Sequence, residues 1–170
     1  HQKIEDNVLH EIVDDLTVTA DYARRVSEIR HFNESNEVLK RGISLTPVKF
    51  GISFTATHLN QAGALLHVYT DGTIHLNHGG TEMGQGLFTK VAQVVANEFQ
   101  VDINRIKMLA SDTSKVPNAS ATAASSGSDM NGKAAQAAAR KIKRRLVSFA
   151  STHFNVAEDA IRFQKNAVQV

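Results

Sequence analysis

The spacing of apolar residues predicts two helices near the amino terminus. Between residues 8 and 35, apolar side chains recur every three or four positions, first through Ile12 and Leu16 and then from Tyr22 onward. Such spacing places the apolar side chains on one face of each of two short α-helices. Thr19 carries a side chain that is preferred at helix N-caps, so we expect it to cap the second helix.

The apolar period changes to two after these helices, which is typical of half-buried strands. Apolar residues alternate over residues 43–56, where Pro47 indicates an edge or a bulge. A β-hairpin is predicted over residues 63–79, because Asp71-Gly72 separates two alternating segments and suits a type I′ turn. Shorter strands are predicted at residues 106–110, 161–163 and 168–170, the last two around Lys165 and Asn166.

Two further helices are predicted in the second part of the chain. Phe88, Val91, Val95 and Phe99 are spaced three, four and four positions apart, which indicates a helix over residues 86–100. A longer helix is predicted over residues 129–150. Its expected buried stripe consists of Ala135, Ala138, Ile142, Leu146 and Phe149.

The order of these elements predicts an α+β fold. Strands and helices are mixed from residue 42 onward, and no linker-like segment divides this part of the chain. We expect a helical N-terminal segment over residues 1–41, followed by an α+β portion over residues 42–170. In that portion, a mixed sheet with β-hairpins is expected to pack against helices.

Composition places the chain among globular proteins. Its 170 residues are 42% hydrophobic and 21% charged with a net charge of +2, so neither disorder nor a strongly basic nucleic-acid-binding surface is indicated. The absence of Cys excludes disulfides, Cys-ligated zinc and an iron–sulfur cluster held by these residues. No apolar run could span a bilayer and the start at His1 lacks a signal peptide, so we expect a cytoplasmic protein. A start without Met also indicates a piece of a longer protein.

Two loops carry the residues most suited to binding an anionic ligand. The glycine-rich turn, Gly79–Gly86, has four glycines ahead of a predicted helix, where bare backbone and a helix N-terminus can approach an anion. The Ser/Ala loop, Ser120–Ser128, can offer successive amides and hydroxyls as an anion-binding nest. Each feature also occurs as an ordinary turn or a mobile polar loop. Two such loops in one domain predict an extended ligand that bears phosphate.

The remaining polar residues form no recognisable catalytic or metal-binding set. His75 and His78 lie three apart in a predicted strand and therefore point to opposite faces, and His67, which could approach His75 across the hairpin, brings no carboxylate pair. The basic run 140–145 is interpreted as the exposed side of a helix, with nucleic-acid binding as the less favoured alternative. Glu82 is the one acid in a predicted cleft and a weak candidate for a general base.

Several segments carry a family resemblance, in the right order along the chain. They are Tyr22–Arg25, Lys49–Thr55, Asn60–Ala64, Tyr69–Gly72, Gly79–Gly86, Val116–Asn118 and Thr122–Ser125. Over essentially its whole length the chain resembles part of the molybdenum-cofactor-binding large subunit of molybdenum hydroxylases, the family of xanthine dehydrogenases and aldehyde oxidases. The Thr-Ala-Ala-Ser sequence at residues 122–125 resembles xanthine dehydrogenase more, because glycines are expected at the two alanine positions in aldehyde oxidase.

The resemblance implies which residues bind the cofactor and the substrate. Phe54 would pack against the purine ring, Thr55 would hydrogen-bond the substrate, and Ala123 and Ala124 would leave room beside the molybdenum. The position of Phe54 in a predicted strand suits a core aromatic residue equally well. Molybdopterin and its phosphate would be held by Met83, Gly84, Gln85, Thr122, Ala123, Ala124, Ser125, Ser126, Gly127 and Ser128.

The implied activity is oxidative hydroxylation of hypoxanthine to xanthine and of xanthine to urate at a molybdenum–molybdopterin centre. Electrons would leave through [2Fe–2S] clusters and FAD to NAD. The implied partners are the purine substrate, the remaining segments of the molybdenum subunit, and the iron–sulfur and FAD parts of an oligomeric enzyme, without nucleic acid or membrane. The family's catalytic glutamate and substrate arginine have no matching motif here. We therefore assign no catalytic or metal-ligating residue and expect this chain alone to be inactive.

Two alternatives stay open at this point. One is an aldehyde oxidase or another N-heterocycle hydroxylase of the same family, which a substrate panel would distinguish. The other is a non-enzymatic module that binds an anion through the Ser/Ala loop. A natural product of only 18.5 kDa without molybdenum would favour the second alternative.

Overall fold

The computed structural model describes residues 4–52, 54–116 and 118–170, so Ser53 and Pro117 of the family motifs lie outside the described residues. The chain forms two compact units, His1–Gly51 and Ile52–Val170, and each is described by itself. The predicted division between residues 41 and 42 stays a prediction. None of the described helices is long and apolar enough to cross a membrane.

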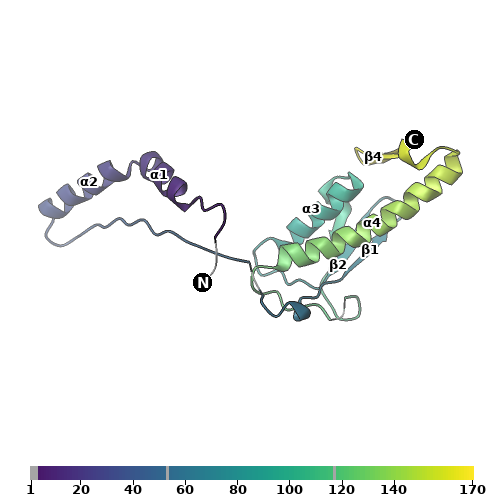
Figure 1. Ribbon diagram of the computed structural model, residues 1–170, viewed down its shortest axis with the longest axis horizontal. Coiled ribbons are helices and arrows are strands. Elements are labelled where there is room, and N and C mark those ends of the chain that lie inside the picture. The colour runs from purple at the N-terminus through teal and green to yellow at the C-terminus, as the bar shows by residue number, and fades with distance from the viewer. Residues whose placement is uncertain (1–3, 53, 117) are drawn as a thin grey trace. The chain divides into compact units, whose positions relative to one another are not determined.

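The first unit contains the two predicted helices (Figure 1). Helix α1 spans Leu9–Thr19 and helix α2 spans Tyr22–Ser35. The prediction that Thr19 caps α2 is wrong, because Thr19 is the last residue of α1 and its hydroxyl donates to the carbonyl of Asp15 at 2.9 Å. The residue before α2 is Asp21, whose backbone is left-handed with a φ of 52°. This left-handed residue separates the two helices.

One asparagine holds the chain after α2 to the helix. The side-chain amide of Asn33 donates to the carbonyl of Arg41 at 2.9 Å and accepts from the Arg41 N–H at 2.8 Å. The Arg41 guanidinium lies 3.8 Å from the centre of the Phe32 ring, which is a favourable cation–π contact. None of the described residues of this unit is buried. Local polar contacts rather than a core therefore define it.

The strand predicted over residues 43–56 is wrong. The described backbone of this range belongs to no strand, and a short 3-10 helix, η1 (Thr57–Leu59), follows it. Phe50 and Ile52 are 70% and 58% exposed. Alternation favours an extended backbone, but a strand also needs a neighbouring strand to complete its hydrogen bonds. The described residues provide no such neighbour.

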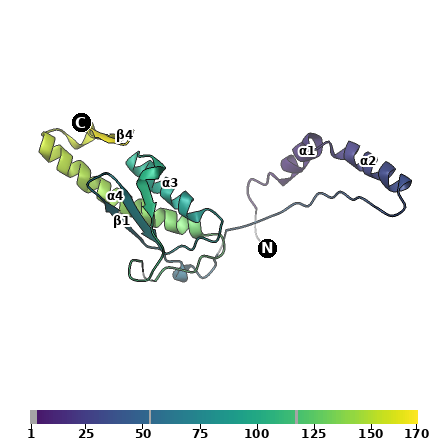
Figure 2. The same ribbon diagram turned by 180° about the vertical axis from the view of Figure 1, so that it is seen from behind.

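In the second unit, two helices lie side by side against a three-stranded sheet (Figures 1 and 2). Strands β1 (Ala64–Val68) and β2 (Ile74–His78) are antiparallel, and β3 (Ile106–Met108) pairs with β2 in parallel. Helix α3 (Leu87–Phe99) connects the parallel strands, and the long helix α4 (Gly127–Phe154) packs beside it. The predicted α+β fold is confirmed.

The last strands form a separate two-stranded sheet. Strands β4 (Arg162–Gln164) and β5 (Ala167–Gln169) are antiparallel. Between them, Lys165 and Asn166 have φ angles of 51° and 65°, and a type I′ turn requires two such left-handed residues. Two more 3-10 helices are η2 (Ile103–Arg105) and η3 (Glu158–Ala160).

The hairpin of β1 and β2 is confirmed, but its turn is not of type I′. Gly72 has a φ of 80°, whereas Asp71 is not left-handed, and type I′ needs both residues in that region. The carboxylate of Asp71 instead accepts the backbone N–H of Thr73 at 2.9 Å and its hydroxyl at 2.7 Å. This local side-chain bond favours a longer loop in which Gly72 alone supplies the left-handed conformation.

The core lies where α3 meets α4 and the sheet. Leu76 of β2, Val91 and Val95 of α3, and Ala135 and Ala139 of α4 are completely buried. Their burial supplies most of the free energy that holds the helices on the sheet. The small alanines of α4 allow the two helix backbones to approach closely.

The predicted buried stripe of α4 holds except at its end. Ala138, Ile142 and Leu146 pack against the core. Phe149 is 67% exposed, so its predicted burial is wrong. Ala150 is buried instead. An α-helix has about 3.6 residues per turn, so Ala150, four residues after Leu146, lies closer to the face of Leu146 than Phe149 does.

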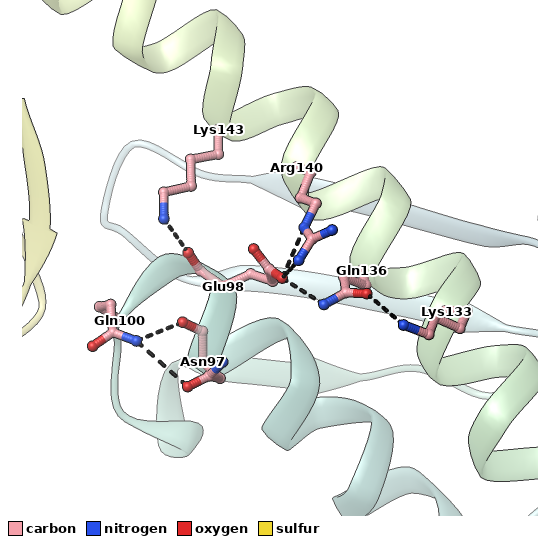
Figure 3. Close-up of polar contacts among 7 residues, drawn as sticks. All are labelled: Asn97, Glu98, Gln100, Lys133, Gln136, Arg140 and Lys143. Atoms are coloured by element: carbon pink, nitrogen blue, oxygen red, sulfur yellow. Dashed lines mark hydrogen bonds and ion pairs between the residues drawn. The ribbon is translucent and has the colours of Figure 1, made fainter. Parts of the chain in front are cut away.

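A polar contact set joins the C-terminal end of α3 to the middle of α4 (Figure 3). The carboxylate of Glu98 on α3 accepts from the Gln136 amide at 2.7 Å and from the Arg140 guanidinium at 3.0 Å. Lys143 donates to the backbone carbonyl of Glu98 at 2.7 Å. Burial alone would raise the pKa of Glu98, but the bonds from Arg140 and Gln136 hold it below its ordinary value. The basic run therefore contributes to helix packing.

Candidate functional site

The glycine-rich turn is pressed against α4. A side chain at Gly80 would place its Cβ 2.6 Å from a methyl carbon of Leu87 and 2.7 Å from the amide nitrogen of Asn131, so it would force these two side chains to shift. The N–H of Gly80 donates to Nδ1 of His78 at 3.0 Å. Burial lowers the pKa of His78, although the charge of Glu82 opposes the shift. The imidazole that supports the turn is therefore neutral.

Glu82 fills the N-terminus of α3 with its own carboxylate. One oxygen accepts the N–H groups of Gly84 at 2.9 Å and Gly86 at 3.0 Å, and the other accepts that of Phe88 at 2.9 Å. These bonds, chiefly those from Phe88 and Gly86, lower the pKa of Glu82. The expectation that this helix end is free for an external anion is wrong. Glu82 caps the helix and is a poor general base.

The Ser/Ala loop is fixed at one end and strained in the middle. The Ser120 hydroxyl accepts the N–H of Gln61 at 2.7 Å, and the Ser120 N–H donates to the Gln61 carbonyl at 2.8 Å. Ala124 and Ser125 are both left-handed, with φ angles of 52° and 56°. Each such residue costs about 1–2 kcal/mol when it is not glycine, and strain of this kind is often found at ligand-binding sites. Ser126, which precedes α4, makes no side-chain capping bond.

The turn and the loop meet and enclose one cavity. The N–H of Thr81 donates to the hydroxyl of Thr122 at 2.8 Å, which ties them together. Beside this tie lies a cavity of about 440 Å³, which we call the loop cavity. It is lined by Met83, Gln85, Leu87, Lys90, Thr122, Ala123, Ala124, Ser125, Gly127 and Ser128. The residues predicted to bind the cofactor thus come together, except that Gly84 and Ser126 do not line this cavity.

Gln85 has a second role that its motif does not reveal. Its side-chain oxygen accepts the N–H of Met83 at 2.6 Å, and its amide nitrogen donates to the carbonyl of Thr81 at 2.9 Å. The side chain braces the turn from within and still lines the loop cavity. One amide proton and one lone pair stay available for a ligand.

Lys90 lines the loop cavity and was not predicted. The apolar periodicity of α3 leaves this residue on the exposed face, where a lysine attracts no notice. Its position four residues after Gly86 is the signal that could have revealed it, because a helix brings residues four apart to the same face. Within the described part of the chain, no carboxylate forms an ion pair with Lys90. Its charge is therefore open to a ligand.

A second cavity adjoins the first. It has a volume of about 240 Å³, and we call it the Phe54 cavity. Ala123 lines both cavities, whereas Ala124 lines only the loop cavity and Thr55 lines neither. The side chain of Asn60 holds the Phe54 carbonyl at 3.3 Å. The other lining residues are Leu59, Ser120, Ala121 and Ser126.

Two histidines face each other across the hairpin, as the sequence predicted. His67 and His75 are register partners in β1 and β2, and the ring of Tyr69 lies 4.6 Å from that of His75. Among the described residues, no group of three or more His, Asp or Glu side chains is arranged to hold a metal ion.

The residues of the loop cavity fit a phosphate-bearing pterin. Hydroxyls of Thr122, Ser125 and Ser128 and the ammonium of Lys90 suit phosphate oxygens. Met83 and Leu87 provide apolar surface for a flat ring. The small side chains of the Ser/Ala loop let the ligand reach backbone amides.

Comparison with known proteins identifies the family. The family model described as "Molybdopterin cofactor-binding domain" matches residues 15–170. The chain is 46% identical to xanthine dehydrogenase of Dictyostelium discoideum over 155 residues, which are 91% of this chain and 11% of that protein. It is 55% identical to nicotinate hydroxylase hnxS of Emericella nidulans over 128 residues, which are 75% of this chain and 10% of that protein.

A solved structure agrees with these relatives. Reconstituted CO dehydrogenase from Oligotropha carboxidovorans superposes with a TM-score of 0.56 at 26% identity, over 61% of this chain and 13% of that one. The chain thus spans about a tenth of the length of the proteins it matches. It belongs to the molybdopterin cofactor-binding domain family and is related in sequence to part of xanthine dehydrogenase.

Proposed function

We propose that these residues form one wall of the cofactor and substrate cavities of a xanthine dehydrogenase, which hydroxylates hypoxanthine to xanthine and xanthine to urate. The observation that carries this proposal is the convergence of the glycine-rich turn and the Ser/Ala loop on one cavity, with the Phe54 cavity adjoining it at Ala123. When bound, the molybdenum–molybdopterin group supplies the redox chemistry.

The loop cavity binds and orients the cofactor. Hydroxyls and amides of residues 122–128 hold the phosphate, and Lys90 adds a charge of opposite sign. Met83 and Leu87 pack on the pterin, while Gln85 keeps the turn in shape and offers its remaining donor and acceptor. Because the turn is tied to the loop through Thr81 and Thr122, the cofactor needs little rearrangement on binding.

The Phe54 cavity orients the substrate. The Phe54 ring packs on a flat heterocycle, and the single methyl group of Ala123 leaves space where the two cavities adjoin. Thr55 lies outside both cavities, so its proposed hydrogen bond requires the substrate to extend beyond the Phe54 cavity.

The proton transfers of the reaction belong to residues outside this chain. Glu82 is engaged by three backbone N–H groups and lines neither cavity. We propose that the intact enzyme is a cytoplasmic oligomer that adds the catalytic groups, [2Fe–2S] clusters and FAD, and that it passes electrons to NAD.

Nicotinate is a second candidate substrate. The 55% identity to nicotinate hydroxylase hnxS exceeds the 46% identity to the Dictyostelium xanthine dehydrogenase, although it covers a shorter stretch. Nicotinate is also a flat N-heterocycle, so the same aromatic contact serves it. The side chains of the two cavities suit both substrates.

The experiment compares substrates and a Phe54 variant in the intact enzyme. Hypoxanthine, xanthine, nicotinate and an aromatic aldehyde are assayed with the wild type, Phe54→Ala and the control Phe149→Ala, which removes an exposed ring of α4. Phe54→Ala is expected to lower kcat/KM for the purines at least tenfold with unchanged molybdenum content, because the ring no longer orients the substrate. Phe149→Ala should match the wild type.

Two results would revise the proposal. Unchanged purine turnover in Phe54→Ala contradicts the substrate role of the Phe54 cavity. If kcat/KM is higher for nicotinate than for either purine, the enzyme is a nicotinate hydroxylase rather than a xanthine dehydrogenase. The proposed role of the loop cavity in binding the cofactor is then unchanged.

A further inference from the structure

His78 lies at the end of β2, directly behind the glycine-rich turn. It is 1% exposed, and its ring meets that of Phe88 edge-on with centres 5.2 Å apart. Its Nδ1 accepts the N–H of Gly80 at 3.0 Å. A nitrogen that accepts a hydrogen bond carries no proton, so this ring is neutral and bears its proton on Nε2.

The surroundings of His78 connect both loops of the cavity. The hydroxyl of Ser111 lies 2.9 Å from the carbonyl of His78 and 3.1 Å from that of Gly80, so it holds both. On the other side of Gly80 lies Asn131, whose amide nitrogen donates to the carbonyl of Gly127 at 2.9 Å. Gly127 begins α4 and lines the loop cavity. A continuous set of contacts therefore runs behind the cavity from His78 to the Ser/Ala loop.

This arrangement leaves polar atoms unpaired. Nε2 of His78 and Oδ1 of Asn131 are buried, and neither has a hydrogen-bond partner among the described residues. An unpaired buried polar group costs free energy, which an apolar side chain at position 78 would avoid. A histidine at this position therefore lowers stability. The feature that it supplies, and that an apolar side chain could not, is the hydrogen bond from the Gly80 N–H to Nδ1.

We propose that His78 is a positioning residue for the molybdenum cofactor, whose neutral ring sets the glycine-rich turn through Gly80 and whose protonation releases the turn and the cofactor. The inference rests on the proposed function, because it takes the loop cavity as the cofactor site. His78 lines neither cavity and acts through Gly80 and the residues that follow it.

The direction of the pH dependence follows from the surroundings of the ring. Burial lowers the pKa of His78 from its ordinary value of 6.5, and the negative charge of Glu82 partly offsets this. Phe88, whose ring meets the imidazole, does not titrate, and neither do Ser111 on the His78 carbonyl and Asn131 beside Gly80. Because the set turn holds the neutral ring, it is favoured above pH 6.5 and is lost as the pH falls through the lowered pKa.

The test uses the intact enzyme and three variants. His78→Asn keeps an acceptor where Nδ1 stands but cannot gain a proton, and His78→Leu has the same branching without an acceptor. His67→Asn, at an exposed histidine of β1, is the matched control. Each protein is held at pH values on either side of 6.5, and bound pterin and molybdenum per polypeptide are then measured, with far-ultraviolet circular dichroism to monitor folding.

The expected pattern separates positioning from a structural role. The wild type and His67→Asn lose pterin progressively as the pH falls below 6.5. His78→Asn retains pterin at every pH. His78→Leu holds several-fold less pterin than His78→Asn at every pH. Neither variant shows the pH step, which is the loss of pterin below pH 6.5. Equal retention by His78→Asn and His78→Leu, or an unchanged pH step in either, overturns the inference. A wild type without pterin at any pH overturns the proposed function, and the inference with it.

Discussion

Single charges determine what the loop cavity can bind. The charged carboxylate of Glu82 is engaged by three backbone N–H groups and lines neither cavity, and the nearby imidazole of His78 is uncharged. Lys90 brings a positive charge to the cavity wall without an ion-pair partner among the described residues. The cavity is therefore suited to a ligand with a negative group.

Removing the charge of Lys90 should weaken cofactor retention. In the intact enzyme, Lys90→Met keeps the aliphatic stem and is expected to lower pterin affinity by roughly tenfold, or about 1.4 kcal/mol, because one charge-assisted bond is lost. Pterin per polypeptide after washing at moderate ionic strength is the measurement. Lys107→Met, at an exposed lysine of β3, is the control. Equal retention in all three proteins would show that Lys90 makes no contact with the cofactor.

The residues that shape the site were only partly predictable from the sequence. Motif resemblance pointed to residues 83–85 and 122–128, and all of these except Gly84 and Ser126 line one cavity. The bracing role of Gln85 and the capping role of Glu82 depend on how the turn folds back on itself. Spacing along the chain does not encode that reversal, so neither role could be derived from it.

The elements were predictable where a local period decides the structure. Helix α3 follows from apolar spacing, and the hairpin of β1 and β2 follows from alternation on either side of Asp71-Gly72. The predicted strand over residues 43–56 failed because pairing depends on a distant neighbour. The predicted burial of Phe149 failed because the buried face of α4 passes from Leu146 to Ala150, four residues on, rather than to the residue three positions on.

The contact of α3 with α4 should depend on Glu98. Its side chain is 12% exposed and joins Gln136 and Arg140 across the helix interface (Figure 3). Glu98→Ala is expected to cost about 2 kcal/mol, because two donors lose their acceptor. Backbone amides of both helices should then exchange with deuterium roughly 30-fold faster in the intact protein.

The control for this change is Glu34→Ala, at an exposed position of α2. The wild type should also lose protection in α3 and α4 as the pH falls below 4.5, since a lowered pKa stabilises only while the carboxylate is charged. Glu98→Ala should lack this acid step. Equal exchange rates in Glu98→Ala and the wild type would contradict the role of Glu98.

At the scale of the whole molecule, the chain supplies two loops and an adjoining aromatic residue rather than a complete catalytic centre. It spans about a tenth of the length of its relatives, and Glu82, its one candidate general base, lines neither cavity. On the proposed function, the loop cavity holds the cofactor by several contacts from one wall. Retention of the cofactor is therefore the most direct property to measure.

The central measurement is the molybdopterin and molybdenum content of the intact natural protein after gentle purification, compared with a Gln85→Ala variant. We expect close to one pterin and one molybdenum per polypeptide in the wild type. The variant should hold several-fold less of both, because Gln85 braces the turn and also lines the loop cavity. A wild type without pterin, or a variant with full content, would contradict the assignment of the loop cavity as the cofactor site.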